Sequence, residues 1–521
     1  MRAIVHITIL MLCVLTMNAQ PSFVRYYQNA GSINTSVILE MESGNLMSGF
    51  AYNSGTSLID PLGNILHVRR YLVDTFMMLQ SIRKHTDNDF AFVGIYSKDT
   101  CGSPVSANPA IGRMDSLGNI TYAKYFTFND RCAAGFGGDL EITVSNDIVA
   151  WGRDYGFYAI RTDPNCELRW AKRFPNRGGF RFIKELSNGD LLTGINMETA
   201  GAAVGRMDAE GNFIWLKSYF RSRAMITDAL IEEDGGFVIA GFTDSIASPG
   251  FLDPLPTNYW PKLFMMKLDG DGEVLWCKGY DISPYRWYPR WGSRLDRTLD
   301  GNYVMLATIG FLSYPGGYRP MMMKTDQNGD TLWTRAAGRS NNVQTAYNLL
   351  VCSDGGYLQI GVDDNIGGYY LFKHDSLGYL PCYNRWHTTT ILDLFPTDSS
   401  FTLTSIDGAT AHPAFITEAE NPPITILEGC ANSIPRPEKH PSGFRIKPNP
   451  STGHFTLSFT DPLMAESYYS VYDTMGKLLF QRPLPQGKQT EEVDLTRFGA
   501  GTYVVRFTSK EGSCHERVVV E

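Results

Sequence analysis

The chain has 521 residues, of which 43% are hydrophobic, enough to bury a large core. Its formal net charge of -8 argues against a nucleic-acid partner, because the phosphate backbone is bound by basic surfaces. Length alone suggests roughly two to four domains.

The first 19 residues have the pattern of a secretory signal peptide. Arg2 is followed by an apolar run from Ile4 to Met17, and Ala19 offers a small residue before the cleavage point. No later run approaches the ~20 apolar residues that a membrane helix needs. The sequence therefore predicts an exported protein without a transmembrane segment.

Eight cysteines follow the predicted signal peptide, and in an exported chain they can oxidise. Connectivity is not readable from the sequence, but Cys101–Cys132 and Cys382–Cys430 are the pairs we favour, because they lie outside the core strands of the repeat described next. None shows Cys-x-x-Cys spacing with partnering histidines, so we expect no zinc site.

One box of residues recurs through the first 380 positions, and Lys267–Trp276 is its fullest copy. A basic residue precedes an aspartate by two positions, a glycine follows the aspartate by three, and an aromatic residue follows it by seven. The third copy has Cys166 in the glycine position, the first copy lacks the basic residue and ends in His67, and the last copy ends in Cys382. The seven aspartates, 45 to 61 residues apart, are Asp60, Asp115, Asp163, Asp208, Asp269, Asp326 and Asp375. Such a period is typical of repeat architectures.

A second turn recurs between the boxes, as in Asp234-Gly235-Gly236 before Phe237. Asp-Gly pairs between apolar runs are typical of tight hairpins, so each unit is predicted to contain four short strands. Four-stranded units of this length are β-propeller blades. We therefore predict an all-β fold with a seven-bladed β-propeller over residues 20–382, or an eight-bladed one. The strand at 22–31 would complete the last blade.

The box itself is predicted to be scaffold. Its aspartate and base would brace the turn before the last strand, and its tryptophan would wedge between neighbouring sheets. Asp269–Glu273 lacks the ligand spacing of a calcium loop, so we expect no metal there. Residues 383–430 carry no box and would be either a degenerate blade or a strap across the ring. Residues 431–443 are rich in proline and charge and are predicted to be a linker.

Residues 444–521 read as a small β-sandwich of alternating strands separated by Asp and Gly turns. Their motifs resemble the C-terminal sorting domain of type IX secretion substrates from Bacteroidetes-type bacteria: a PNP-x-x-G opening, a D-x-x-G-K turn and a G-x-Y strand. Lys447 and Glu521 depart from the family pattern. The motif residues are Pro448, Asn449, Pro450, Gly453, Asp473, Gly476, Lys477, Gly501 and Tyr503.

The resemblance implies export in two steps, with residues 444–521 contacting the type IX secretion machinery, and a location in the medium or on the outer-membrane surface. The repeat also resembles the DGG-containing, Trp-ending repeats that often accompany such domains. That likeness implies architecture and not activity.

No catalytic motif stands out: there is no Gly-x-Ser-x-Gly, no His-Glu-x-x-His and no phosphate-binding glycine loop. We therefore predict no catalytic residues, no metal and no cofactor, while a site assembled from several blades stays open. A cluster of acidic or histidine side chains at the pore mouth would favour an enzyme.

Long insertions fall between second and third strands, or between blades, and these connections share one face of a propeller. The insertions in blades 5 and 6 are aromatic and basic, a composition that suits stacking on sugars or anchoring a protein, although the rings could instead pack on one another. The candidate ligand-binding residues are Trp260, Tyr285, Arg286, Trp287, Tyr288, Arg290, Trp291, Tyr314 and Tyr318.

The sequence thus predicts an exported β-propeller that acts in binding or adhesion at the cell surface, with a glycan or protein ligand, and it favours this role over that of an enzyme. The alternatives are a secreted polysaccharide-processing or other hydrolytic enzyme that uses the loop-rich face, and a structural surface component.

Overall fold

The structure is a computed structural model. It describes residues 22–28, 37–50, 55–72, 76–86, 88–97, 108–128, 136–153, 156–198, 201–220, 224–243, 262–282, 286–288, 293–310, 317–339, 342–380, 383, 385–387, 389–419, 424–428, 444–459, 462–463, 467–473, 478–509 and 512–521. The predicted signal peptide, the linker at 431–443 and all four cysteines of the favoured disulfides lie outside these residues.

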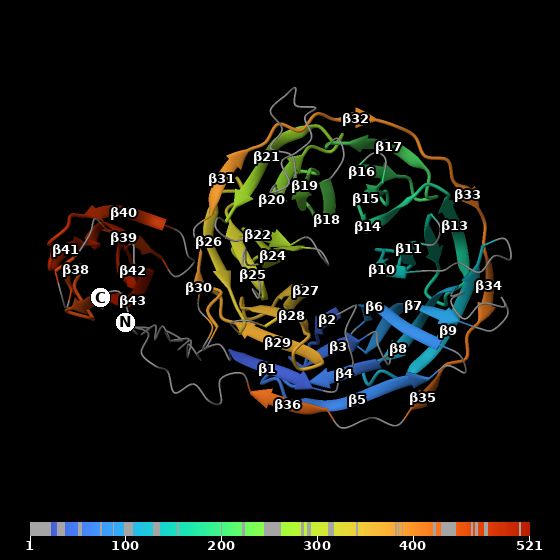
Figure 1. Cartoon of the computed structure of the whole chain (residues 1–521), viewed down its shortest axis with the longest axis horizontal. Helices are drawn as coiled ribbons and strands as arrows, with labels where there is room; N and C mark the ends of the chain where they lie inside the picture. Colours follow the sequence, from blue (N-terminus) through green and yellow to red (C-terminus); the bar gives the residue numbers. More distant parts are fainter. Residues whose placement is uncertain are drawn as a thin grey trace, which may run out of the picture.

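Seven antiparallel sheets, counted over the described residues, form a closed ring (Figure 1), and we call the region around the axis of this ring the central channel. This is the predicted seven-bladed propeller. From channel to rim, blade 1 contains β2 (Val37–Glu40), β3 (Leu46–Phe50), β4 (Gly55–Ile59) and β5 (Ile65–Leu72). Blade 2 contains β6 (Phe76–Thr86), β7 (Asp89–Ser97), β8 (Asn108–Asp115) and β9 (Ile120–Thr127). Blade 3 contains β10 (Phe136–Ile142), β11 (Ile148–Arg153), β12 (Phe157–Thr162) and β13 (Leu168–Phe174).

Blades 4 to 7 continue the same order. Blade 4 contains β14 (Gly178–Glu185), β15 (Leu191–Met197), β16 (Gly201–Met207) and β17 (Phe213–Ser218), and blade 5 contains β18 (Ala224–Ile231), β19 (Phe237–Thr243), β20 (Lys262–Leu268) and β21 (Val274–Asp281). In blade 6, the innermost position is shared by β22 (Arg286–Tyr288) and β23 (Arg294–Arg297), which are followed by β24 (Tyr303–Gly310), β25 (Tyr318–Thr325) and β26 (Thr331–Ala336). Blade 7 contains β27 (Gln344–Val351), β28 (Tyr357–Asp363), β29 (Gly368–His374) and β1 (Phe23–Gln28).

The repeated box forms the turn that follows the third strand of each blade, and in blades 1 to 6 this turn leads into the fourth strand. In blade 5, the Asp269 carboxylate accepts the backbone N–H groups of Asp271 and Glu273 at 3.0 and 2.8 Å. Gly272 has a φ of 78°, a backbone conformation that favours glycine, and Cys166 adopts a φ of 59° at the same position in blade 3. The aspartate therefore braces this turn, as predicted.

The basic residue of the box has a different partner from the one expected. The Lys267 ammonium lies 3.0 Å from a carboxylate oxygen of Asp234, in the turn between the first and second strands of the same blade. Equivalent pairs join the two turns of blades 2, 3, 4, 6 and 7: Arg113 with Asp89, Arg161 with Asp147, Arg206 with Asp190, Lys324 with Asp300 and Lys373 with Asp354. The base thus links both tight turns of one blade.

The box tryptophan packs on the box glycine of the next blade. A Cβ atom added at Gly329 would lie 3.0 Å from the Trp276 ring, and the rings of Trp170, Trp215 and Trp333 lie equally close to the glycines that follow them around the ring. Glycine is therefore favoured at this position for two reasons, the positive φ and the space that the indole occupies. This confirms that the tryptophan wedges between neighbouring blades.

Strand β1 closes the ring. It pairs antiparallel with β29 along its whole length, from Phe23 opposite Lys373 to Gln28 opposite Gly368. The first strand of the chain is therefore the fourth strand of blade 7, as the sequence suggested, and both ends of the repeat meet in one sheet.

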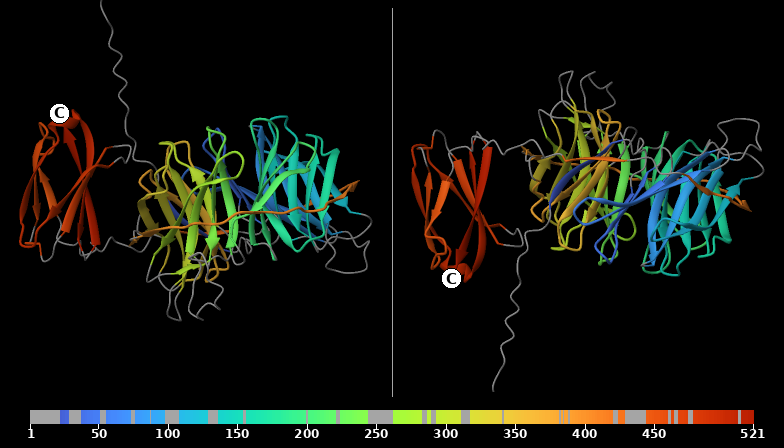
Figure 2. Two further views of the ribbon diagram at one scale, coloured as in Figure 1. Left: turned by 90° about the horizontal axis from the view of Figure 1, so that it is seen from above. Right: turned by 90° about the horizontal axis from the view of Figure 1, so that it is seen from below.

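A belt of short strands between residues 385 and 428 encircles the ring. Each strand pairs antiparallel with the outermost strand of one blade, in the order blade 6, 5, 4, 3, 2, 1 and 7 (orange in Figure 1). Edge views show it running along the rim (Figure 2). The strands are β30 (Arg385–Trp386), β31 (Thr390–Asp393), β32 (Ser399–Ser400), β33 (Ile406–Asp407), β34 (Thr410–Pro413), β35 (Thr417–Ala419) and β36 (Thr425–Glu428).

The belt also pairs with the rim by charge. The ammonium of Lys172 lies 3.0 Å from Asp407, and Lys217 and Arg25 lie 3.8 and 3.4 Å from Asp398 and Glu428. Because the belt adds a fifth strand to each blade, it covers the outer sheet edges, which otherwise present unpaired backbone groups.

Residues 444–521 form a β-sandwich of two sheets. One contains β37 (Phe444–Lys447), β38 (His454–Phe459) and β41 (Thr490–Asp494), and the other β40 (Leu478–Leu484), β39 (Ser467–Tyr472), β42 (Gly501–Ser509) and β43 (Gly512–Val520). A core that includes Phe455, Leu457, Val471 and Val505 fills the space between them. A 3-10 turn, η1 (Thr496–Phe498), precedes β42. Among the described residues, no helix could span a membrane.

Candidate functional site: the mouth of the central channel

The channel is lined by the innermost strand of each blade, and five of these strands carry a β-bulge near their start. The bulges lie in β6, β10, β14, β18 and β27. The facing strand offers a glycine in blades 4, 5 and 7, where a Cβ atom at Gly194, Gly241 or Gly361 would lie 2.0 to 2.2 Å from its neighbours. Bulges turn side chains out of the regular pleat, which here directs polar residues at the channel.

Side chains from adjacent blades satisfy backbone N–H groups on the inner strands. Asp228 in blade 5 accepts the N–H of Leu295 in blade 6 at 3.1 Å, and Asp296 in blade 6 accepts that of Val351 in blade 7 at 3.1 Å. Likewise, Gln80 accepts the N–H of Gly138 at 2.7 Å. These carboxylates and amides tie the blades together around the channel, because unpaired buried N–H groups would be costly.

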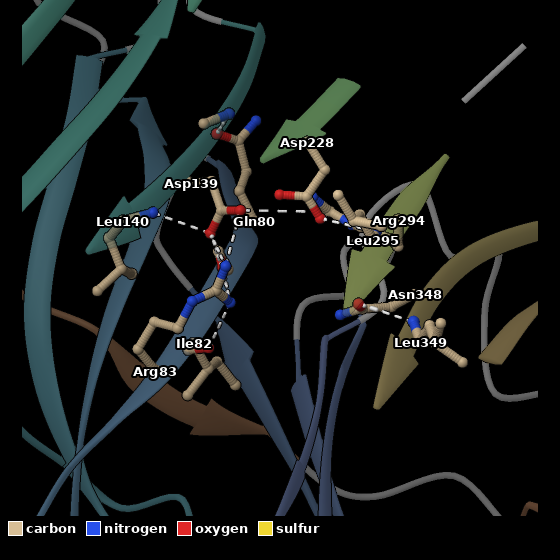
Figure 3. A network of polar contacts seen from close by, with 12 residues as sticks. Gln80, Ile82, Arg83, Asp139, Leu140, Asp228, Arg294, Leu295, Asn348 and Leu349 are labelled. Carbon is tan, nitrogen blue, oxygen red and sulfur yellow. Dashed lines mark hydrogen bonds and ion pairs between the residues drawn. The ribbon is translucent and has the colours of Figure 1, made fainter. Parts of the chain in front are cut away.

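Asp139 is the centre of a network that crosses the channel (Figure 3). Its carboxylate accepts hydrogen bonds from the Ser81 hydroxyl and from the Arg83 guanidinium, 2.8 Å away. The Arg294 guanidinium of blade 6 lies 3.9 Å from the same carboxylate of blade 3. Burial alone would raise the pKa of Asp139, but the charges of Arg83 and Arg294 hold it below its ordinary value.

Two further arginines lie near the start of β14 and at the end of β11, at the end of the channel where the first strands begin. Arg181 occupies the bulge of β14, between the residue pairs Phe180–Ile195 and Phe182–Gly194, and Arg153 ends β11. Both side chains are exposed to water. The Arg153 side chain runs over Gly179, where an added Cβ atom would lie 3.9 Å from its Cβ and Cδ atoms.

Arg153, Arg181 and Arg294 form a basic cluster, which we call the arginine mouth. The Arg181 side chain reaches water but is surrounded by protein atoms on its other sides, and this desolvation, together with the charges of Arg153 and Arg294, lowers its pKa. Within the described part of the chain, Arg153 and Arg181 make no hydrogen bond or ion pair, and Arg294 shares Asp139 with Arg83. Among the described residues, Asp139 is therefore the ion-pair partner of the cluster, and it is shared with Arg83.

The mouth lies on the face where the long connections begin and end. A four-stranded antiparallel blade places the start of its first strand and the end of its second on one face. Arg181 lies near the start of a first strand, Arg153 ends a second strand, and β7, β19 and β24 end at this face before the segments 98–107, 244–261 and 311–316. We call this the loop face, and the opposite one, which carries the tight turns, the turn face.

Deeper in the channel, carboxylates of contrasting acidity lie side by side. Burial raises the pKa of Glu141, two residues from Asp139 on β10, and Lys184 and Arg83 offset this only in part. Lys184 also lies 3.2 Å from Asp228. Among the described residues, no group of three or more His, Cys, Asp or Glu side chains is placed to hold a metal ion.

The predicted ligand-binding residues are only partly covered by the structure. Trp260, Tyr285, Arg290, Trp291 and Tyr314 lie outside the described residues.

The backbone of Arg286, Trp287 and Tyr288 forms β22, which pairs with the loop-face end of β24. Tyr318 begins β25 and is half-buried. The backbone of all four residues therefore lies at the loop face.

The predicted sorting residues lie in the C-terminal sandwich, where the PNP motif holds its last strand. The Asn449 side chain donates to the Arg517 carbonyl at 2.7 Å and accepts the Val519 N–H at 2.9 Å, so it pairs like an added strand with β43. Pro448 and Pro450 flank Asn449.

The glycine and tyrosine of the sorting motif fix neighbouring turns. Gly453 has a φ of 98°, and an added Cβ atom would lie 2.7 Å from Thr496. The Tyr503 hydroxyl donates to the carbonyls of Phe498 and Gly499 at 2.8 Å. Asp473 directly follows β39 and Gly501 begins β42, whereas Gly476 and Lys477 lie outside the described residues.

Sequence reasoning missed the arginine mouth. Its three arginines come from blades 3, 4 and 6 and occupy different positions in the repeat, so no motif connects them. One sequence signal could have found Arg181. A glycine within the second strand, such as Gly194, indicates a bulge on the facing first strand, and the extra residue of that bulge points toward the channel.

The fold and site together define a β-propeller with a charged central channel, followed by a small β-sandwich. Residues 445–521 match the family described as secretion system C-terminal sorting domain, which is that of type IX secretion substrates. The chain is therefore a propeller protein exported by type IX secretion, either into the medium or to the cell surface. No curated protein matches it.

Solved structures with similarity include the WD40 domain of Pan2 from Neurospora crassa, 14% identical over 66% of this chain and 90% of that chain, with a TM-score of 0.41. YCF48 bound to a D1 peptide is 12% identical over 68% and 97%, with a TM-score of 0.37. PorZ, a surface component of type IX secretion in Porphyromonas gingivalis, is 11% identical over 94% and 93%, with a TM-score of 0.16. These similarities are too distant to carry an argument about function.

Proposed function

We propose that the protein is an exported binding or adhesion protein that engages a glycan or protein at the loop face of its propeller. The observation that carries this proposal is the asymmetry of the ring: the described strands at one face end before long connecting segments, whereas tight turns fill the other face. Ligand sites commonly lie on long loops that a rigid scaffold positions.

The aromatic and basic residues of blades 5 and 6 are the proposed contacts. β22 carries Arg286, Trp287 and Tyr288 at the loop-face end of blade 6, and Tyr318 begins the strand that follows β24. Tryptophan and tyrosine stack on sugar rings and also anchor protein interfaces, especially beside arginine. The repeat's likeness to the DGG-containing, Trp-ending class supports the architecture and leaves the ligand to be found by experiment.

The test uses purified exported protein on a glycan array and a surface-protein array. Trp287→Ala and Trp291→Ala are expected to lower affinity for the captured ligand by about ten-fold or more, because buried aromatic anchors dominate binding energy. The control is Leu299→Ala, since Leu299 is 68% exposed on the turn face of blade 6. The proposal is contradicted if the wild type binds nothing on either array, or if both tryptophan variants bind the ligand as tightly as the wild type does.

A hydrolase is the second candidate, and one specific observation favours it. The pKa of Glu141 is raised and that of Asp139 is lowered on the same strand, a contrast that acid–base catalysis uses. The first candidate stays preferred because Asp139, Asp228 and Asp296 already accept hydrogen bonds that hold the blades together. Polysaccharide hydrolysis by the wild type that Glu141→Gln abolishes would reverse this preference.

A further inference from the structure

Building on the proposed function, we infer that the arginine mouth binds the anionic group of an acidic glycan. Arg153, Arg181 and Arg294 reach the same region of the channel from three different blades. A ligand with a carboxylate or sulfate at its end would complete this cluster.

The first argument is the lack of protein partners. Arg153 and Arg181 make no hydrogen bond or ion pair to any residue that the structure describes, and both side chains are exposed to water. By contrast, Arg83, deeper in the same channel, forms a two-oxygen contact with Asp139 at 2.8 Å. Guanidinium groups prefer such paired contacts with planar anions, so the two upper arginines offer unused donors.

The second argument is electrostatic. The charges of Arg153 and Arg294 lower the pKa of Arg181, so the three like charges oppose one another in the free protein. A bound anion would relieve this repulsion. Three like charges whose printed ion-pair partner among the described residues, Asp139, is shared with Arg83 are typical of a binding site rather than of a scaffold.

The third argument concerns how far a ligand can enter. The contacts of Asp139 with Arg83 and with Arg294, itself part of the arginine mouth, cross the channel from blade 2 to blade 6 (Figure 3). This bridge favours a terminal charged group over a polymer threaded through the ring. The end residue of an acidic sugar chain has that form.

The fourth argument favours a glycan over a protein. Stable protein interfaces bury roughly 800 Å² per partner around an apolar centre. Large exposed apolar side chains of the described propeller lie on the turn face, as do Leu275 and Leu299, or on the belt, as does Phe395. The described mouth is polar and charged, which suits a small anionic group.

The experiment measures binding of the purified full-length exported protein to oligogalacturonate, sialyllactose and a heparin oligosaccharide. Their neutral counterparts are methyl-esterified oligogalacturonate, lactose and desulfated, carboxyl-reduced heparin oligosaccharide, and poly-L-glutamate represents an acidic peptide. At least one acidic glycan is expected to bind at least ten-fold more tightly than its neutral form. That binding should weaken between 50 and 500 mM salt, because ions screen charge pairs.

Variants assign the binding to the mouth. Arg153→Ala and Arg181→Ala are expected to lower affinity at least ten-fold, and Arg181→Lys nearly as much, because lysine keeps the charge and loses the paired contact. Arg177→Ala is the matched control and should stay within two-fold, since Arg177 precedes the same strand and is paired with Glu198. Because Arg181 lacks a partner, Arg181→Ala should melt no lower than the wild type, which separates lost binding from lost folding.

The outcomes are distinguishable from those of the proposed function. Equal binding of acidic and neutral forms, or full binding by both alanine variants, would overturn the anion site while leaving a loop-face binding protein intact. Tight binding of poly-L-glutamate without any acidic glycan would overturn the glycan assignment. If the wild type binds no member of this panel, the inference is overturned. If the wild type also binds nothing on the glycan and surface-protein arrays, the proposed function is overturned too.

Discussion

The Tyr27 hydroxyl donates a hydrogen bond to the carbonyl of Gly63 at 2.8 Å, and in doing so joins the first strand of the chain to blade 1. Tyr71, Tyr219 and Tyr280 make the same contact with Gly118, Gly272 and Gly329 at 2.7 to 2.8 Å. The closing contact of the ring is therefore the same as the contact that joins blades connected by sequence. Closure of the propeller uses a standard blade interface.

Tyr27→Phe is expected to destabilise the protein by about 1–2 kcal/mol, because it leaves a buried carbonyl without its donor. Tyr219→Phe removes the equivalent hydrogen bond between blades 4 and 5 and should cost a similar amount. Urea denaturation of the two variants provides the comparison. If Tyr27→Phe unfolds like the wild type while Tyr219→Phe is weakened, then β1 does not close the ring through this contact.

Gly329→Ala should destabilise more than Gly235→Ala. Both glycines have a positive φ, 79° and 81°, so each alanine incurs a backbone cost of about 1–2 kcal/mol. At Gly329 the new Cβ atom would also lie 3.0 Å from the Trp276 ring, whereas at Gly235 nothing lies within 4 Å.

We expect an additional loss of about 1–2 kcal/mol at Gly329 from displacement of the indole. Thermal and urea unfolding of the two variants measure the difference. Equal destabilisation would show that the tryptophan wedge does not stabilise the blade interface.

The belt should loosen locally in acid. The hydrogen bond from Lys172 lowers the pKa of Asp407. A lowered pKa stabilises the folded state above the unfolded carboxyl value of about 3.9, and this stabilisation is lost as the pH falls through the lower folded value. The protection of the backbone amides of residues 406–408 against hydrogen exchange, relative to an unfolded chain at the same pH, should therefore fall below about pH 4. Asp407→Asn should exchange faster at neutral pH and show little further change in acid; an unchanged wild-type profile would contradict the belt's charge pairing.

Asn449→Ala should weaken the C-terminal sandwich and reduce export. The substitution removes both contacts with β43, the bonds to the Arg517 carbonyl and the Val519 N–H, for a loss of about 1–3 kcal/mol. The ratio of extracellular to periplasmic protein measures the effect on export. Gln486→Ala, at an exposed turn of the same domain, is the control. Normal export of Asn449→Ala would show that these contacts do not support sorting.

Much of the propeller could be predicted from the sequence because each blade repeats the same local chemistry. The box aspartate, the positive-φ glycine and the following tryptophan are fixed by one turn and one blade interface, so their spacing alone gives the blades. The closing strand was visible for the same reason, since residues 22–28 resemble the fourth strand of a blade.

The belt and the site were beyond this reasoning. β32 is only the two residues Ser399–Ser400, and such strands take their position from a sheet edge that already exists, so they carry no pattern of their own. Arg153, Arg181 and Arg294 meet only because the ring closes. The partner of Lys267 was missed because it depends on two turns, 33 residues apart, that lie side by side at the end of one blade.

The central claim is that the loop face binds the ligand and the turn face is scaffold. Hydrogen exchange of the exported protein, free and saturated with the most tightly bound array ligand, tests this most directly. We predict protection at the starts of β14 and β23, at the end of β11 and along β22, with the box turns around Gly272 and Gly329 unchanged. Protection confined to the box turns or to the belt would contradict the account.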